Sequence, residues 1–345
     1  MGRKFLNMVL HEYGSRMYSL CRINVSTHLF YPTAKDAATA HEDANARKKK
    51  RGGIWPSTIS TCKRLPRTLV NFSTPPSTVA ASNMRFFSLL PEVGETSVMF
   101  ADPSCNSSVY DMGTKSFVLT PRSYFCKPYD SITLSIRDRR INGNLLDHED
   151  DHGLYVMNSM DDSFEFFNYC KNLSTYPLLY NKWYWSPLPP PPSRGSPLVA
   201  AAVIDSSDAI CASSKHGTYT FDVSREVWSH TGSWVLPFHR PAEPLAPRKI
   251  AYVAFDLSSP AMAESAPSPL HDWEYLGLLP DELLPVGRAL VNLGSGKFCN
   301  ATHCRKKRSA RQEEDEVVRC ADGLQLIHHK SQRYNFENVR IHCVL

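Results

Sequence analysis

Short runs of alternating apolar and polar residues follow one another along most of the chain, and three stretches of this pattern align without a gap. They are SVMFADPSCNSSVYD (97–111), LYVMNSMDDSFEFFN (154–168) and DAICASSKHGTYTFD (208–222). Each consists of a short apolar run, a small or polar turn and an alternating run that ends in an aromatic residue followed by Asp or Asn. Their starts are 57 and 54 residues apart. A strand–turn–strand unit that recurs at this period is typical of radial β architectures, so we expect three hairpins at equivalent places in consecutive blades.

The last residue of two of these stretches also predicts how the chain turns. Asp111 is followed six residues later by Phe117, and Asp222 is followed six residues later by Trp228. An Asp at this place can cap a tight turn by accepting a hydrogen bond from the backbone two residues on, which sends the chain back as the next strand. We therefore expect Phe117 and Trp228 to return to the face of a sheet.

Aromatic residues also occur in pairs two residues apart, and such pairs share one face of a strand. The pairs are Trp183 with Trp185 and Tyr219 with Phe221. We interpret them as packing between blades, with a stacking platform for nucleic-acid bases as the alternative. The tetraproline at 189–192 is expected to be a rigid connector between repeats; docking as a polyproline segment into an aromatic groove is the alternative.

The two ends of the chain are predicted to share a sheet. Residues 5–10 and 17–25 are β-prone runs that form a hairpin, and 339–344 is a last β-prone run. Because an unpaired edge invites aggregation, we expect the strands near Phe5 and Ile341 to complete one blade.

The sequence predicts three segments: an N-terminal hairpin (1–30), a disordered or extended loop (31–66) and the propeller repeats (67–345). The middle segment is Ala-rich, continues into RKKKRGG and lacks apolar periodicity. Without the loops roughly 300 residues remain, which corresponds to about six units of ~45–55 residues. The expected fold is therefore all-β, a single β-propeller of about six blades.

Charge and hydropathy exclude several classes of protein. Lys and Arg (39) exceed Asp and Glu (34) by 39 − 34 = 5, and much of this excess lies in two short runs, 47–51 and 305–308. A basic surface for nucleic acid is therefore not indicated, although 47–51 could be a nuclear import signal or simply solvated loop charge. No apolar run approaches the ~18 residues of a membrane span, and the N-terminus does not resemble a signal peptide. We expect a cytoplasmic or nuclear protein without membrane contact.

The ten cysteines are scattered, and we interpret them as reduced, mostly buried thiols and not as a disulfide framework. Four possible ligands, Cys299, Cys304, Cys320 and His328, could be drawn together as a zinc site. Their spacing lacks the paired C-x2-C knuckle, so strand and loop cysteines near a histidine are the preferred interpretation. The run at 147–152 (DHEDDH) also offers metal ligands, but it is interpreted as a solvated loop.

Other motifs do not specify a reaction either. The stretch Gly294-Ser295-Gly296-Lys297 is similar to a phosphate loop, but Val291 and Phe298 occupy the positions that require Gly and Ser or Thr. A hairpin turn between two strands is the better interpretation. The chain has no G-x-S-x-G elbow, H-E-x-x-H helix or dinucleotide-binding glycine fingerprint.

Several motifs resemble a plant family, abundant in grasses, of uncharacterised proteins with degenerate kelch-like or F-box-associated β-propeller repeats. They are GTYTFDVSREVWSHTGSWVLPF (217–238), WYWSPLPPPP (183–192), ALVNLGSGKFC (289–299) and HHKSQRYNF (328–336). The resemblance covers nearly the whole chain except the 31–66 loop. It implies a kelch-like propeller and no established activity.

Together these features favour a non-catalytic scaffold whose loops bind an unidentified protein partner. We assign no catalytic, cofactor-binding or metal-binding residue, and we expect no cofactor. The alternatives are a propeller enzyme with a dispersed site on the ring axis and a weak nucleic-acid binder that uses the basic loops. His, Asp, Tyr or Arg side chains converging in the central channel would favour the enzyme.

Overall fold

The structure is a computed structural model that describes a defined set of residues. These are residues 3–12, 14–51, 59–62, 66–73, 84, 86–90, 97–102, 104–126, 131–137, 152–159, 162–173, 180–193, 195–204, 209–237, 250–255, 265–275, 285–294, 297–304, 309–320, 323–335 and 339–345. The chain divides into two compact units, each described by itself. The first comprises Met1–Ser73, Pro241–Ala254 and His271–Leu345, and the second Thr74–Arg240 and Phe255–Leu270.

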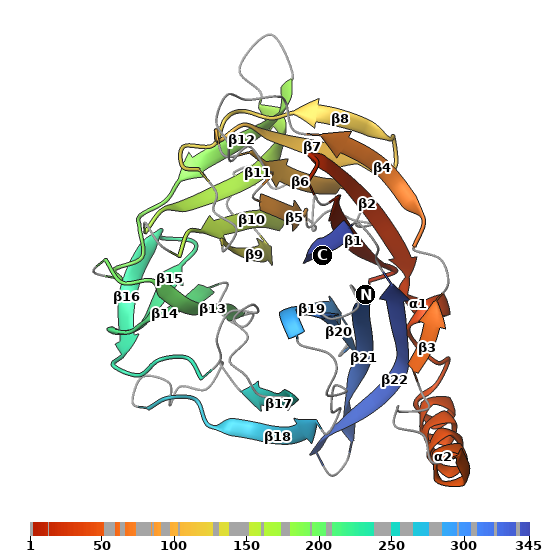
Figure 1. Ribbon diagram of the computed structural model, residues 1–345. Helices are drawn as coiled ribbons and strands as arrows, with labels where there is room; N and C mark the ends of the chain where they lie inside the picture. The colour runs from red at the N-terminus through yellow and green to blue at the C-terminus, as the bar shows by residue number, and fades with distance from the viewer. Residues whose placement is uncertain are drawn as a thin grey trace. The chain divides into compact units, whose positions relative to one another are not determined.

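The second unit contains three antiparallel sheets of four strands, and in each the strands follow one another in sequence order (Figure 1). The first repeat sheet is β5 (Phe86–Leu89), β6 (Ser97–Ala101), β7 (Ser107–Asp111) and β8 (Ser116–Leu119). The second is β9 (Ile132–Arg137), β10 (His152–Met157), β11 (Phe164–Leu173) and β12 (Tyr180–Pro187). The third is β13 (Leu198–Ile204), β14 (Ala209–Ser214), β15 (Gly217–Asp222) and β16 (Val227–Gly232).

The three aligned stretches of the sequence are the inner hairpins of these sheets, which confirms the repeat prediction. They correspond to β6–β7, β10–β11 and β14–β15, with pairs such as Ser97↔Asp111, Leu154↔Phe167 and Ala209↔Asp222. Four-stranded meanders of this kind are the blades of β-propellers. The fold is therefore all-β and of the propeller class, and the described residues form six sheets.

Alternation along the strands explains how the repeat sheets pack. One face of the second sheet carries Leu154, Val156 and Phe167 against Met99 and Val109 of the first sheet. The opposite face packs against the third sheet, because consecutive side chains of a strand point to opposite faces. The cluster on that side includes Tyr155, Phe164, Phe166, Ile210 and Phe221.

The first unit has one sheet of four strands and one of five. The order of the four-stranded sheet is β23 (Val339–Val344), β1 (Phe5–Glu12), β2 (Met17–Asn24) and β4 (Thr68–Ser73). The five-stranded sheet contains β19 (Pro285–Gly294), β20 (Lys297–Cys304), β21 (Ser309–Cys320), β22 (Gly323–Asn335) and β3 (Ile59–Cys62). Strand β1 pairs with β23, for example at Met8↔Val344, so the expected pairing between the two ends of the chain is found. The strands β17 (Ile250–Phe255) and β18 (Pro269–Tyr275) form a separate pair.

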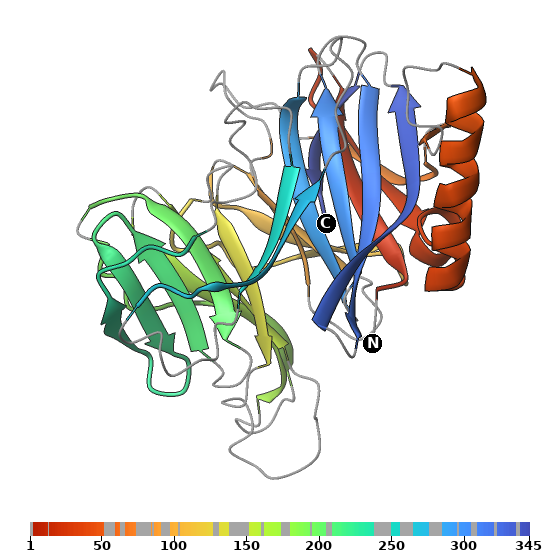
Figure 2. The ribbon, with the colours of Figure 1, turned by 90° about the horizontal axis from the view of Figure 1, so that it is seen from below.

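The segment expected to be a disordered or extended loop, 31–66, instead contains helix α2 (Ala34–Arg51) and strand β3, so that expectation was wrong for these residues. The Ala-rich sequence has high helix propensity, which outweighed its missing apolar periodicity. Thr33 caps the helix by accepting a hydrogen bond from Asp36 N at 3.1 Å, and the basic run 47–51 lies at the C-terminal end, which the helix dipole favours. In Figure 2, α2 lies alongside the five-stranded sheet, where it contacts β22.

A short helix, α1 (Val25–His28), follows β2 and helps to close the core of the first unit. Asn24 caps it by accepting a hydrogen bond from Thr27 N at 3.0 Å. The core combines residues of both sheets with α1 and the residues after it. Its buried members are Leu6, Met8, Leu10, Cys21, Ile23, Val25, Leu29, Phe30, Val291, Leu293, Cys299 and Tyr334.

Candidate functional site

The sequence candidates for metal and phosphate binding do not form sites in the described residues. Cys304 pairs with Ser309 at one end of β21, whereas Cys320 pairs with Gly323 at the other end. The 12-residue strand spans roughly 36 Å at ~3.3 Å per residue, which is far too long for both thiols to ligate one zinc ion. In the part of the chain that the structure describes, no group of three His, Cys, Asp or Glu side chains could hold a metal ion.

Other candidates have structural roles. The GSGK stretch joins β19 to β20, which pair as far as Gly294↔Lys297, and this confirms the hairpin. The tetraproline connects β12 to β13, and Pro189 O accepts a hydrogen bond from Trp228 Nε1 at 2.8 Å. Residues 147–151 lie outside the described residues. No described helix is both long and apolar enough to cross a membrane.

Of the paired aromatic residues, Trp183, Trp185 and Phe221 pack in the apolar clusters between sheets, as interpreted from the sequence, whereas Tyr219 contacts His230 of its own sheet. Trp185 is 5% exposed and lies 4.6 Å from Phe167 between ring centroids, while Trp183 stacks on the same ring at 4.9 Å. Tyr219 and Phe221 are both buried. These rings are therefore not available as a stacking platform for bases.

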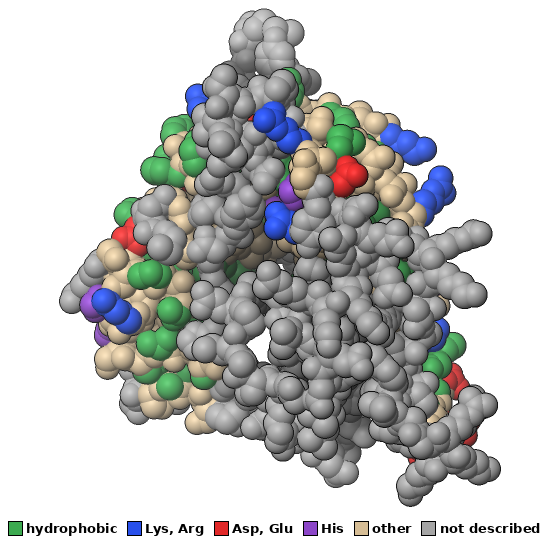
Figure 3. Space-filling view, in the orientation of Figure 1, with side chains coloured by type: hydrophobic (Ala, Val, Ile, Leu, Met, Phe, Trp, Pro, Cys, Tyr) green, Lys and Arg blue, Asp and Glu red, His purple; other side chains and the backbone are tan. Residues whose placement is uncertain are grey.

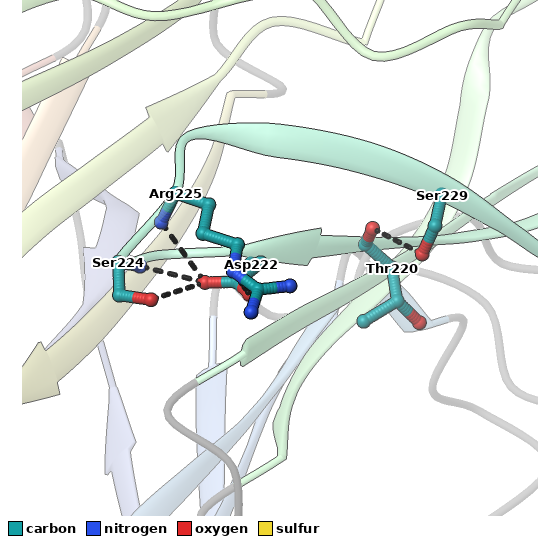
Figure 4. A network of polar contacts seen from close by, with 5 residues as sticks. All are labelled: Thr220, Asp222, Ser224, Arg225 and Ser229. Carbon is teal, nitrogen blue, oxygen red and sulfur yellow. Dashed lines mark hydrogen bonds and ion pairs between the residues drawn. The ribbon is translucent and has the colours of Figure 1, made fainter.

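The Asp-capped turns also form as predicted, and Figure 4 shows the one at Asp222. Asp222 Oδ1 accepts hydrogen bonds from Ser224 Oγ (2.7 Å), Ser224 N (2.9 Å) and Arg225 N (3.0 Å). The Ser224 hydroxyl is the main cause that lowers the pKa of this carboxyl, and the backbone N–H of Arg225 adds to it. Asp111 makes the equivalent bonds to Gly113 N and Thr114 N. Both networks are turn caps, and their polar groups serve the backbone.

An aromatic and basic cluster lies on the four-stranded sheet of the first unit. His11 stacks on Tyr18 with ring centroids 4.5 Å apart, and Tyr18 contacts His342 edge-on at 5.5 Å. His11 Nδ1 accepts a hydrogen bond from Arg340 Nε at 3.2 Å, so its other nitrogen carries the proton and donates to Ser15 O at 3.0 Å. Burial is the main cause that lowers the pKa of both histidines, that of His342 to about 4. With both ring nitrogens of His11 engaged, the cluster is a structural one.

One pair of cysteines departs from the expectation of reduced thiols. Cys105 and Cys126 form a disulfide with Cα atoms 4.6 Å apart, so for this pair the expectation was wrong. The reason is topological, because the β7–β8 hairpin returns residue 126 to the turn that precedes β7. The free cysteines of the described residues include Cys211, and burial raises the pKa of its thiol to about 11.

The disulfide marks the end of the surface feature that we regard as the candidate site. We call residues 120–126, which follow β8, the strap. At its start, Thr120 N donates to Ser107 O at 3.3 Å, and the Ser107 hydroxyl donates to Pro121 O at 3.0 Å. The same Ser107 oxygen accepts a hydrogen bond from Trp185 Nε1 at 3.1 Å, so the strap is connected to the core between the first two repeat sheets.

Further along, the strap is held to the turn before β7. The Arg122 guanidinium donates to Ser104 O through Nε (2.9 Å) and Nη2 (2.7 Å), and Ser123 N donates to Cys105 O at 3.1 Å. Tyr124 N donates to Oε1 of the fully buried Glu165 at 2.7 Å, and this bond joins the strap to the second sheet. The strap is therefore fixed along its whole length.

This rigid segment displays apolar side chains to solvent. In the strap, Tyr124 is 62% and Phe125 40% exposed. In the adjacent strand β8, Phe117 is 48%, Val118 39% and Leu119 86% exposed. We call these five side chains the β8–strap surface; it extends over both faces of β8, because Val118 points to the opposite face from Phe117 and Leu119. Figure 3 shows hydrophobic side chains reaching the surface in this region, where β7 and β8 lie in Figure 1.

Sequence reasoning placed Phe117 on a sheet face but missed this surface. The available signal was the run FVLTPRSYF (117–125), in which apolar residues occupy consecutive positions of the last strand of a meander, where one face is normally polar. An arrangement of fixed, exposed aromatic and aliphatic side chains can do little chemistry, but it can bury apolar area against a partner.

Comparisons with solved structures give only distant likenesses. The β-propeller domain of Cps50 (Swd1) from Myceliophteria thermophila is 14% identical, with 67% of this chain and 70% of that chain covered and a TM-score of 0.32. Hsv2 of Kluyveromyces lactis is 9% identical, with 77% and 89% covered and a TM-score of 0.33. The AfRom2 CNH domain is 11% identical, with 98% of each chain covered and a TM-score of 0.34. At such scores they add nothing to the fold assignment, which rests on the sheets themselves.

Sequence comparison is more decisive. No curated protein matches the chain. A family model described as a protein of unknown function matches residues 3–337, nearly the whole chain. The protein therefore belongs to the DUF1668 family.

Proposed function

We propose that the protein is a non-catalytic protein-interaction scaffold and that the β8–strap surface is its contact site. The observation that carries this proposal is the combination of exposure and rigidity in the strap. Tyr124 and Phe125 are exposed, yet the backbone around them is fixed by a disulfide and by bonds to Ser104, Cys105 and Glu165.

Rigidity matters because binding is weakened by the entropy of ordering mobile side chains and loops. A strap that is already ordered avoids this loss. Aromatic residues that are presented in this way become the anchors that dominate the binding energy, and each is worth about 2 kcal/mol or more when it is fully buried by a partner. The kelch-like character of the repeats and a cytoplasmic or nuclear location belong to the same proposal.

Affinity capture with matched variants tests the proposed site. The bait is the full chain, and the test variant carries Tyr124→Ser and Phe125→Ser. The control is Val227→Ser, because Val227 is 57% exposed on β16, the equivalent outer strand of the third repeat sheet. Thermal melting of each bait verifies that it is folded.

The baits are incubated with an extract of the cells that express the protein. We expect the wild-type chain and the Val227→Ser variant to retain the same partner proteins, and the double variant to lose them. Equal retention by all three baits, or no retained protein at all, would count against this surface as the contact site. Recovery of a stoichiometric cofactor or turnover in an activity screen would favour the enzyme alternative instead.

A further inference from the structure

The outer edge of β8 presents backbone groups as well as side chains. In the sheet order β5-β6-β7-β8, strand β8 is the last, and it pairs with β7 at Val109↔Val118 and Ser108↔Leu119. The bond from Thr120 N to Ser107 O fixes which residues of β8 bond to β7. Because bonded positions alternate in an antiparallel pair, Ser116 and Val118 direct their backbone N–H and C=O groups toward β7.

Phe117 and Leu119 consequently direct their backbone N–H and C=O groups away from the sheet. Two outward-facing residues at alternate positions offer free backbone N–H donors and C=O acceptors, and another strand can pair with these groups. Their side chains are also 48% and 86% exposed, and all four residues of β8 are exposed.

The last strand of the third repeat sheet and β4 of the first unit, which are also edge strands, expose more polar residues. Strand β16 exposes Ser229 and His230 besides Val227, and β4 exposes Thr68, Asn71 and Ser73 besides Leu69. Polar or charged residues at an edge are a usual protection against unwanted pairing. Strand β8, with the sequence Ser-Phe-Val-Leu, has no charged residue and only exposed positions.

The charges that flank β8 indicate what kind of segment fits. Lys115 precedes the strand and Arg122 follows it, and both are exposed; the Arg122 guanidinium keeps its positive charge while two of its N–H groups donate to Ser104 O. If two copies of β8 paired antiparallel with Phe117 opposite Leu119, Lys115 of each copy would lie opposite Pro121 and beside Arg122 of the other. The like charges would repel at both ends, and Pro121 has no N–H to donate.

We propose that β8 accepts an extended segment of another protein as a fifth strand of the first repeat sheet. The segment has apolar side chains at alternate positions and an acidic residue near each end, opposite Lys115 and Arg122. This inference rests on the proposed function, since it names the mode by which the same surface binds.

The test separates backbone pairing from side-chain contact at a single position. Leu119→Ala removes the side chain but keeps the outward N–H, whereas Leu119→Pro also removes the N–H. Proline is tolerated at an edge position whose N–H faces solvent, so the bonds to β7 stay intact. The probe comes from a library of random 12-residue peptides that is selected on the immobilised full chain, and a selected peptide is then titrated by fluorescence polarisation.

We expect selected peptides with alternating apolar residues and acidic ends. Leu119→Pro should weaken their binding roughly tenfold or more, and Leu119→Ala roughly threefold or less, since an outward backbone bond is lost only in the first. Lys115→Glu should also weaken binding. Unchanged melting temperatures verify that the variants are folded.

Equal effects of Leu119→Pro and Leu119→Ala, or selected peptides without this pattern, would overturn the added strand. Analytical ultracentrifugation tests whether the wild-type chain dimerises and whether Leu119→Pro abolishes the dimer. If both are observed, a second copy of the chain occupies the edge, and the proposal of a segment from another protein is overturned. Failure of the proposed function is distinguishable, because it appears as retention of partners by the Tyr124→Ser, Phe125→Ser double variant.

Discussion

Replacement of Trp228 by alanine should destabilise the second unit, and the structure allows the magnitude to be worked out. The ring is half-buried on β16, with its centroid 5.0 Å from that of Phe221 and 5.7 Å from that of Phe164. Its Nε1 donates to Pro189 O at 2.8 Å. Trp228 therefore joins the third sheet to the second sheet and to the connector between them.

Each aromatic pair contributes ~0.5–1.5 kcal/mol beyond the area that it buries. Partial burial of the indole adds about 1–1.5 kcal/mol, and a hydrogen bond near the surface adds about 0.5 kcal/mol. The sum is about 2.5–5 kcal/mol for Trp228→Ala. Trp228→Phe keeps the ring contacts and loses the hydrogen bond, so it should cost only about 1 kcal/mol.

Urea unfolding, monitored by far-ultraviolet circular dichroism, measures these differences in the free energy of unfolding. Val227→Ala on the same strand is the matched control, because Val227 is 57% exposed and should change the free energy of unfolding by less than about 0.5 kcal/mol. A loss below about 1 kcal/mol for Trp228→Ala would refute the reasoning and would mean that the ring packs too loosely to connect the two sheets.

Three further predictions concern the titratable and redox-active groups. Reduction of the Cys105–Cys126 disulfide, or its replacement by serines, should lower stability by about 3 kcal/mol, as measured by melting with and without dithiothreitol. In the folded state the pKa of His342 is lowered to about 4, whereas in the unfolded chain it is 6.5. The stability that the neutral His342 contributes is therefore fully present above pH 6.5 and is lost as the pH falls toward 4. The contribution of His342 to the free energy of unfolding should therefore fall by roughly 2 kcal/mol between pH 6.5 and 5, and His342→Gln should remove this part of the pH dependence while the part due to His11 remains. Burial raises the pKa of Cys211 to about 11, so iodoacetamide at pH 8 should alkylate it far more slowly than the same thiol in urea.

The inner hairpins could be predicted from the sequence because each is a local unit whose apolar alternation matches the pleat of a strand. The pairing of β1 with β23 followed from a different consideration, the need to cover an edge. Helix α2 was missed because its stability comes from alanine propensity, a Thr33 cap and basic residues in the last turn, none of which produces an apolar stripe.

The candidate site was less accessible to sequence reasoning. The Cys105–Cys126 disulfide depends on the β7–β8 turn bringing together residues 21 positions apart, and their spacing alone gives no sign of this. Glu165 lies within an aromatic strand and would be read as a solvent-facing residue. Its actual role, holding Tyr124 N, depends on the packing of two sheets that the sequence does not specify.

The position of β1 between β2 and β23 has a consequence for synthesis. Met8 pairs with Val344, so 336 residues separate the partners. At ~5–20 residues per second, β1 emerges from the ribosome roughly 20–70 s before its neighbour exists. The three repeat sheets need no such delay, because each pairs strands that follow one another in the chain. The nascent protein therefore carries finished repeat sheets and an N-terminal hairpin with an open edge, which makes that hairpin the segment on which a chaperone has the longest time to act.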